Sequence, residues 1–287
     1  EVAADREIVV VDIDDGSLEA MAGDAFGVGR FPWPRAVYGE LVDEMRRQKA
    51  RAVVFDIELY EPDLVNPQSD AVLNEALRRT DNTYFPIKML SRIARDEGVW
   101  LAKVAPGLGL ATRGTPDPAA RATLELPFAI DRSAWPRTGL IDFLPDADGV
   151  GRRYWMARDI GGYVIPSLPA RVALDLGYGV PDAASARLAF ARGGEFPHPR
   201  VAFVDLYEDI QRGKRERPRD EFAGKIVVVG ASATHLGDFR ATPVAHAYRG
   251  VELVATAIDN LKNARWLREA PLWVSLAITC VLFAPLL

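Results

Sequence analysis

Two kinds of hydrophobic pattern alternate along the chain. Continuous runs of apolar, mostly β-branched residues occupy positions 8–11, 52–55 and 226–229, and such runs are typical of strands covered on both faces of a sheet. Between them lie segments whose apolar residues recur every three or four positions, which predicts helices. These helices are expected over residues 35–49, 69–79, 166–176 and 250–262. The alternation predicts an α/β fold with a mostly parallel or mixed sheet and helices on both faces.

The middle of the chain has a weaker pattern. Prolines and glycines interrupt residues 88–137, which are predicted to form an irregular insertion with one short strand at 123–126. Two largely apolar stretches, 139–144 and 153–157, flank the acidic turn 146–149. This arrangement predicts a β-hairpin.

The last sixteen residues, 272–287, carry no charge. A helix of that length spans about 24 Å, which is shorter than the roughly 30 Å hydrocarbon core of a bilayer. Trp266 and Trp273 flank its start, as aromatic residues do at membrane interfaces. We therefore expect residues 266–287 to be the start of a transmembrane helix that continues beyond Leu287. A C-terminal helix packed into a soluble core is the alternative.

Composition narrows the class of protein. The chain has 287 residues, of which 49% are hydrophobic and 26% charged, and this excludes a disordered tail, a collagen-like fibre and a disulfide-framed miniprotein. A net charge of −5 argues against a nucleic-acid partner. The single cysteine, Cys280, lies in the C-terminal run, so residues 1–265 are expected to form one domain that needs no disulfide.

Carboxylates follow two of the predicted strands. Asp12 and Asp14 come after the first strand and Asp56 after the second, while Gly230 follows the third and Asp238 lies in the loop beyond it. Because ligands bind at the carboxyl ends of strands in an open α/β sheet, we expect Asp12 or Asp14 to face Asp56 across a crevice. Such clustered oxygens would suit Mg²⁺ or Ca²⁺. The alternative is that these acids cap helices and accept backbone hydrogen bonds.

Three further motifs are candidate ligand sites. The small-residue loop 230–234 can present backbone N–H groups to an anion, with Ser232 adding a hydroxyl donor. Arg35 opens a predicted helix and is a candidate to contact a ligand carboxylate, although Trp33 beside it is more typical of core packing. The acidic turn 146–149 is similar to the opening of a calcium loop but lacks the distal glutamate, which favours an ordinary turn.

Several segments resemble, in order along the chain, one family of extracellular sensors. They are residues 9–18, 33–35, 52–56, 139–153, 222–232, 237–238, 242–243 and 250–261. Together they resemble the second class of the CHASE group, named for cyclases/histidine kinases associated sensory extracellular domains. The likeness covers essentially the whole chain and is weakest in the insertion at 88–137.

This resemblance implies a receptor input domain on the extracytoplasmic (periplasmic or extracellular) side of the cell membrane. It implies a membrane helix before Glu1, one or more after the domain, and a cytoplasmic output module in the same polypeptide. That module would be an adenylate cyclase, a histidine kinase of a two-component system or a diguanylate cyclase. We expect a homodimer, no cofactor and no enzymatic activity in this chain itself. The resemblance supplies no ligand.

The helix at 250–262 is expected to relay a binding event to the membrane segment because it leads directly into residues 266–287. Its candidate relay residues are Gly250, Glu252, Asp259 and Asn260. Two other classes of function remain open from the residues alone. One is a metal-dependent hydrolase or phosphotransfer domain that uses the strand-end carboxylates, and the other is an assembly scaffold that senses nothing.

Overall fold

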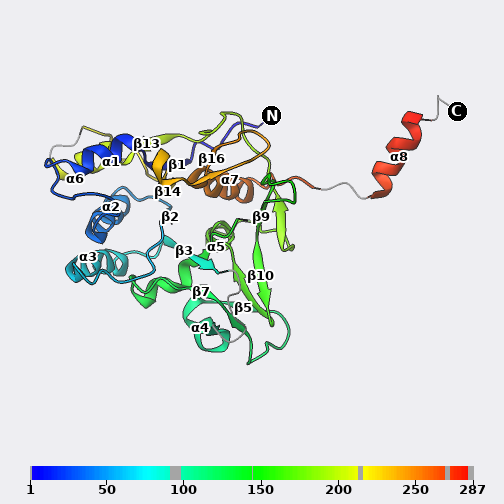
Figure 1. Ribbon diagram of the computed structural model, residues 1–287, viewed down its shortest axis with the longest axis horizontal. Helices are drawn as coiled ribbons and strands as arrows, with labels where there is room; N and C mark the ends of the chain where they lie inside the picture. The colour runs from blue at the N-terminus through cyan, green and yellow to red at the C-terminus, as the bar shows by residue number, and fades with distance from the viewer. Residues whose placement is uncertain (1, 91–97, 144, 213–215, 269–271, 284–287) are drawn as a thin grey trace.

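The computed structural model describes residues 2–90, 98–143, 145–212, 216–268 and 272–283. In this part of the chain a seven-stranded mixed sheet forms the centre of the molecule (Figure 1). Parallel strands follow one another in the order β13, β1, β14, β2 and β3, with β8 parallel and the short β7 antiparallel to β3. These strands are β1 (Ile8–Ile13), β2 (Ala52–Asp56), β3 (Thr83–Met89), β7 (Leu124–Glu125), β8 (Thr138–Leu140), β13 (Arg200–Ala202) and β14 (Ile226–Ala231).

Helices cover both faces of this sheet, which confirms the predicted α/β class. Side chains alternate along each strand, so Val9 and Val11 face one layer while Ile8 and Val10 face the other. The first layer contains α1 (Asp15–Ala22), α2 (Arg35–Arg47), α3 (Pro67–Arg78) and α6 (Phe203–Gln211). The second contains α5 (Leu168–Asp175) and α7 (Gly250–Lys262).

The strand register aligns three of the candidate residues. Asp12 of β1 lies opposite Gly230 of β14, and Gly230 lies opposite Asp56 of β2. The three positions therefore form one row at the carboxyl end of the sheet, although they come from distant parts of the sequence.

The predicted hairpin at 139–144 and 153–157 is wrong. Strand β8 pairs with β3, and a close approach keeps it there, because a Cβ on Gly139 would lie 2.5 Å from the backbone nitrogen of Leu168 in α5. The hairpin in this region instead has Gly161 and Gly162 as its two-residue turn, both with positive φ. In the turn 146–149, ion pairs from Arg152 engage both aspartates, as an ordinary turn allows.

Smaller elements complete the body. The described residues of the insertion contain the helices α4 and η1 and several paired strands, so the insertion is more regular than predicted. Its expected strand at 123–126 corresponds to β7. The smaller elements of the body, inside and outside the insertion, are β4 (Val99–Trp100), α4 (Leu101–Leu108), β5 (Ala111–Thr112), β6 (Arg121–Ala122), η1 (Arg132–Arg137), β9 (Arg153–Trp155), β10 (Ala157–Ile160), β11 (Tyr163–Pro166), β12 (Ser185–Arg187), η2 (Thr234–Leu236), β15 (Phe239–Arg240) and β16 (Tyr248–Arg249).

The apolar C-terminal run forms α8 (Leu272–Phe283), which lies away from the body in Figure 1. Five of its large side chains are more than half exposed; they are Trp273, Leu276, Ile278, Leu282 and Phe283. Among the described residues, no helix combines the length and the apolar character needed to cross a membrane. Residues 269–271 and 284–287 of the predicted membrane segment lie outside the described part of the chain.

Candidate functional site

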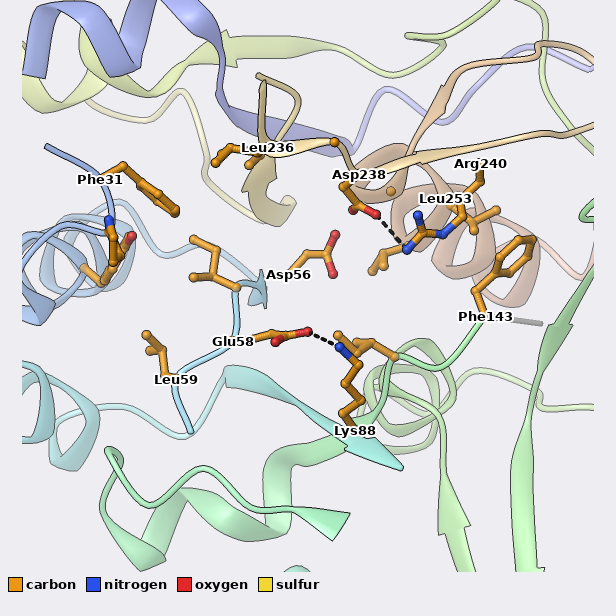
Figure 2. Close-up of a pocket in the computed structure, with 18 of the residues that line it drawn as sticks. Phe31, Asp56, Glu58, Leu59, Lys88, Phe143, Leu236, Asp238, Arg240 and Leu253 are labelled. Carbon is orange, nitrogen blue, oxygen red and sulfur yellow. Dashed lines mark hydrogen bonds and ion pairs between the residues drawn. The ribbon is translucent and has the colours of Figure 1, made fainter. Parts of the chain in front are cut away.

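A cavity of about 620 Å³ opens at the carboxyl ends of β2 and β14 (Figure 2). The chain leaves β2 toward α3 on one face of the sheet and leaves β14 toward α7 on the other. Divergent connections of this kind open a crevice between neighbouring strands, where ligands of α/β proteins bind. The lining residues come from segments 31–38, 56–59, 141–143, 231–240 and 250–254, together with Lys88 and Tyr154.

Asp56 ends β2 and carries its carboxylate into the middle of this cavity, as Figure 2 shows. Within the described part of the chain, that carboxylate has neither a hydrogen bond nor an ion pair. Burial, together with the nearby carboxylates of Asp238 and Glu58, raises the pKa of Asp56 to about 7, although Arg240 acts in the opposite direction. A carboxyl group that changes its charge near neutral pH thus stands at the centre of the pocket.

The other charged groups around Asp56 have partners (Figure 2). Arg240 forms a 2.8 Å ion pair with Asp238, and Lys88 forms a 3.1 Å pair with Glu58. Asp238 also packs against the start of α7, where a Cβ on Gly250 would lie only 1.7 Å from its Oδ2 atom. The absence of a side chain at Gly250 is therefore what lets this carboxylate lie at the helix N-terminus, where negative charge is favoured.

Arg35 lines the pocket at the start of α2, where the sequence places it. Its guanidinium is engaged by the protein itself, because Nη2 donates to the Glu61 carbonyl at 3.0 Å and Nε lies 3.6 Å from Asp70. Trp33 is only 1% exposed and packs with its ring 4.8 Å from that of Phe203, as the core-packing interpretation predicts.

The prediction that Asp12 or Asp14 faces Asp56 is wrong. Val251 of α7 packs over Gly230, the residue between Asp12 and Asp56 in the row, so closely that a Cβ there would lie 2.7 Å from Val251 Cγ2. Asp12 accepts 2.8 Å hydrogen bonds from Arg200 and Ser232. Asp14 caps α1, which is the role that the alternative gave it.

The expected ligands for Mg²⁺ or Ca²⁺ are therefore not gathered at one place. Across the described ranges, no group of three or more His, Cys, Asp or Glu side chains is arranged to hold a metal ion.

The sequence predicts that the loop 230–234 presents backbone N–H groups and the Ser232 hydroxyl to an anion. The structure corrects this prediction, because these donors already have partners within the protein. The backbone nitrogens of Ser232 and Ala233 both donate to the Ile13 carbonyl at 3.1 Å. The nitrogen and hydroxyl of Thr234 both donate to the Asp15 carboxylate. The donors of this loop are thus satisfied by the protein's own oxygens.

Helix α7 combines an almost wholly buried surface with two buried acids. Glu252 and Asp259 lie on either side of His198, whose Nδ1 is 2.7 Å from Glu252 and whose Nε2 is 3.4 Å from Asp259. Burial lowers the pKa of His198, but the two carboxylates outweigh burial and raise it to about 9. Asn260 exchanges hydrogen bonds with both backbone groups of Ala189. Polar contacts therefore fix this helix to the loops around it.

A family model for the CHASE2 domain matches residues 2–287. The chain belongs to the CHASE2 domain family. CHASE2 domains are extracellular sensory domains of signalling receptors, so the family is sensory rather than catalytic. The receptors that contain them are membrane proteins with cytoplasmic output modules. Comparisons with curated proteins and with solved structures give no match.

Sequence reasoning missed several residues of this CHASE2 domain. Lys88 and Tyr154 line the pocket from β3 and β9, and the local sequence pattern does not predict how these strands pair. His198 has no spacing motif, but Glu252 and Asp259 are two helical turns apart on a buried helix, and that pattern could have predicted a cationic partner for them.

Proposed function

We propose that this CHASE2 domain is the ligand-binding input domain of a membrane receptor and that its ligand binds in the pocket around Asp56. One observation carries the proposal: the first turn of α7, through Gly250, Leu253 and Val254, forms part of the pocket wall. The other end of the same helix leads to α8. A ligand that contacts this wall would therefore act directly on the element that connects the domain with the membrane segment.

The relay proposed here runs along α7 to residues 266–287, which we take as the beginning of a membrane helix. The domain would lie on the extracytoplasmic side, and the receptor would act as a homodimer joined by its membrane-proximal helices. Its output module would be a nucleotide cyclase, a diguanylate cyclase or a histidine kinase. A ligand shifts such a receptor by binding its two conformations with different affinity.

A thermal-shift screen of residues 1–287 against ions, small acids, amines and cell-wall fragments tests the proposal. A compound that binds only the folded state raises the melting temperature by mass action. We expect stabilising compounds to act on the wild type but not on Leu236→Trp, which places an indole in the pocket mouth, where Leu236 is 37% exposed.

Leu64→Trp is the matched control, because Leu64 is 89% exposed and does not line the pocket. It should respond as the wild type does. If the effective compounds stabilise Leu236→Trp equally, they bind elsewhere and the proposed site is wrong. If no compound stabilises the wild type, the chain behaves as an assembly scaffold and the sensing proposal fails.

A further inference from the structure

We infer that the pocket around Asp56 binds a singly charged amine with an apolar, ring-sized body. The inference rests on the proposed function, since it names the class of ligand for the same site. It is carried by the balance of charges around the cavity and by the character of the walls.

The first step is the charge balance. Among the charged side chains that line the pocket, Arg240 is paired with Asp238, and Lys88 is paired with Glu58. Arg35 is engaged by Asp70, which does not line the pocket. In the described structure these pairs leave the Asp56 carboxylate without a counter-ion. One positive charge in the ligand completes the balance.

The second step is the position of the unbalanced charge. Figure 2 shows the Asp56 carboxylate directed into the cavity on the side of Asp238. The Asp238 carboxylate makes ionisation of Asp56 harder, so a cation placed between them is attracted by both. An ammonium group has three donors, which exceeds what one carboxylate needs. The hydroxyl of Tyr154, buried in the pocket wall and without a hydrogen-bond partner among the described residues, is a further acceptor near Asp56.

The side chains of the pocket wall indicate the uncharged part of the ligand. Apolar and aromatic side chains stand among the lining residues of the cavity, and such groups favour a ring or a branched hydrocarbon body. The apolar side chains labelled in Figure 2 are Phe31, Leu59, Phe143, Leu236 and Leu253. An aromatic face also attracts cations, which strengthens the preference for an amine.

An anionic ligand would find no free backbone donor at residues 232–234, in the loop after β14. The loop donors at Ser232, Ala233 and Thr234 are bonded within the protein, and Asp238 occupies the N-terminus of α7. An anion would also have to bind beside the Asp56 carboxylate, whereas an ammonium group is attracted by it.

Isothermal titration with three probes of matched shape tests the inference: tryptamine, the neutral alcohol tryptophol and the anion indole-3-propionate. At pH 8 we expect tryptamine to bind at least tenfold more tightly than either of the other two. Its affinity should fall by about tenfold as the pH drops from 8 to 6, because protonation of Asp56 removes the carboxylate. The charges that face Asp56 are Asp238, Glu58 and Arg240.

Asp56→Asn should lower tryptamine affinity at least tenfold and remove its pH dependence. Asp24→Asn is the matched control, since Asp24 is exposed and does not line the pocket, and it should change affinity less than threefold. Equal or tighter binding of indole-3-propionate that Leu236→Trp removes would overturn the amine class while supporting the pocket. Unchanged tryptamine binding in Asp56→Asn, or no binding of tryptamine, would also overturn the inference. The proposed function is tested apart from it by the wider thermal-shift screen.

Discussion

The Asp56 carboxyl group makes the stability of the unliganded domain depend on pH. Its pKa rises from 3.8 to about 7 on folding, mainly through burial, so folding favours the protonated form. The stabilising contribution is fully present below pH 3.8 and is lost as the pH rises through about 7. Asp56→Asn keeps the shape of the protonated group but cannot ionise.

We therefore expect the unfolding free energy of Asp56→Asn, measured relative to that of the wild type, to increase by about 2 kcal/mol as the pH rises from 5 to 8. The cavity is open to solvent, which keeps this below the full value that the change in pKa implies. Urea denaturation at both pH values measures it. Glu58→Gln should show no comparable gain, and parallel curves for Asp56→Asn and the wild type would contradict the burial argument.

At the level of elements, buried polar contacts hold α7 in one position. His198 bridges two carboxylates of this helix, and its pKa of about 9 means that the protonated form is favoured on folding. The contribution is fully present below the unfolded pKa of about 6.5 and is lost as the pH rises through about 9.

His198→Gln should destabilise the domain by about 3 kcal/mol at pH 6.5, because it leaves buried Glu252 without its cationic partner. The difference from the wild type should narrow by pH 9.5, as the wild type loses its own charge. Chemical denaturation across this range gives the measurement. His235→Gln, at a largely exposed histidine, should change stability by less than about 0.5 kcal/mol, and an equal loss at every pH would refute the charge-based account.

The elements that the sequence predicts well are those that local pattern determines. The continuous apolar runs became β1, β2 and β14, and the helix at 250–262 has the predicted bounds. The hairpin prediction was wrong because the turn 146–149 indicates where the chain reverses direction but not which strands the flanking segments pair with. Strand pairing is decided by non-local packing such as that of Gly139 against α5.

The same limit applies to the candidate site. The strand ends could be placed from sequence because parallel strands align their carboxyl ends, and Asp56, Gly230 and Asp238 do meet there. The sequence could not tell that α7 would pack over Gly230 and divide the row of acids. Val251, which makes that contact, lies about twenty residues after Gly230 in the sequence. The same contact separates Asp12 from the pocket.

At the scale of the whole molecule, the proposed path from the pocket to α8 passes through a short piece of chain after α7. After α7 the backbone forms a bridge to the body, where the Leu267 nitrogen donates to the Arg187 carbonyl of β12 at 2.8 Å. Residues that face each other in an antiparallel bridge have Cα atoms about 4.5–5.5 Å apart, which suits a disulfide. A cross-link at this bridge would fix the exit of α7 to the body.

The proposed relay predicts that this cross-link silences the receptor. Arg187→Cys with Leu267→Cys, in a Cys280→Ala background, should abolish the ligand-dependent change in cyclase or kinase output of the intact receptor in membranes, and dithiothreitol should restore it. A disulfide between Asp159→Cys and Val164→Cys, which face each other in β10 and β11, is the control and should leave the response intact. A ligand can act only through a difference between two conformations of the chain that connects it to the output. A normal response in the oxidised Arg187–Leu267 variant would therefore show that the signal does not require movement where the chain leaves α7.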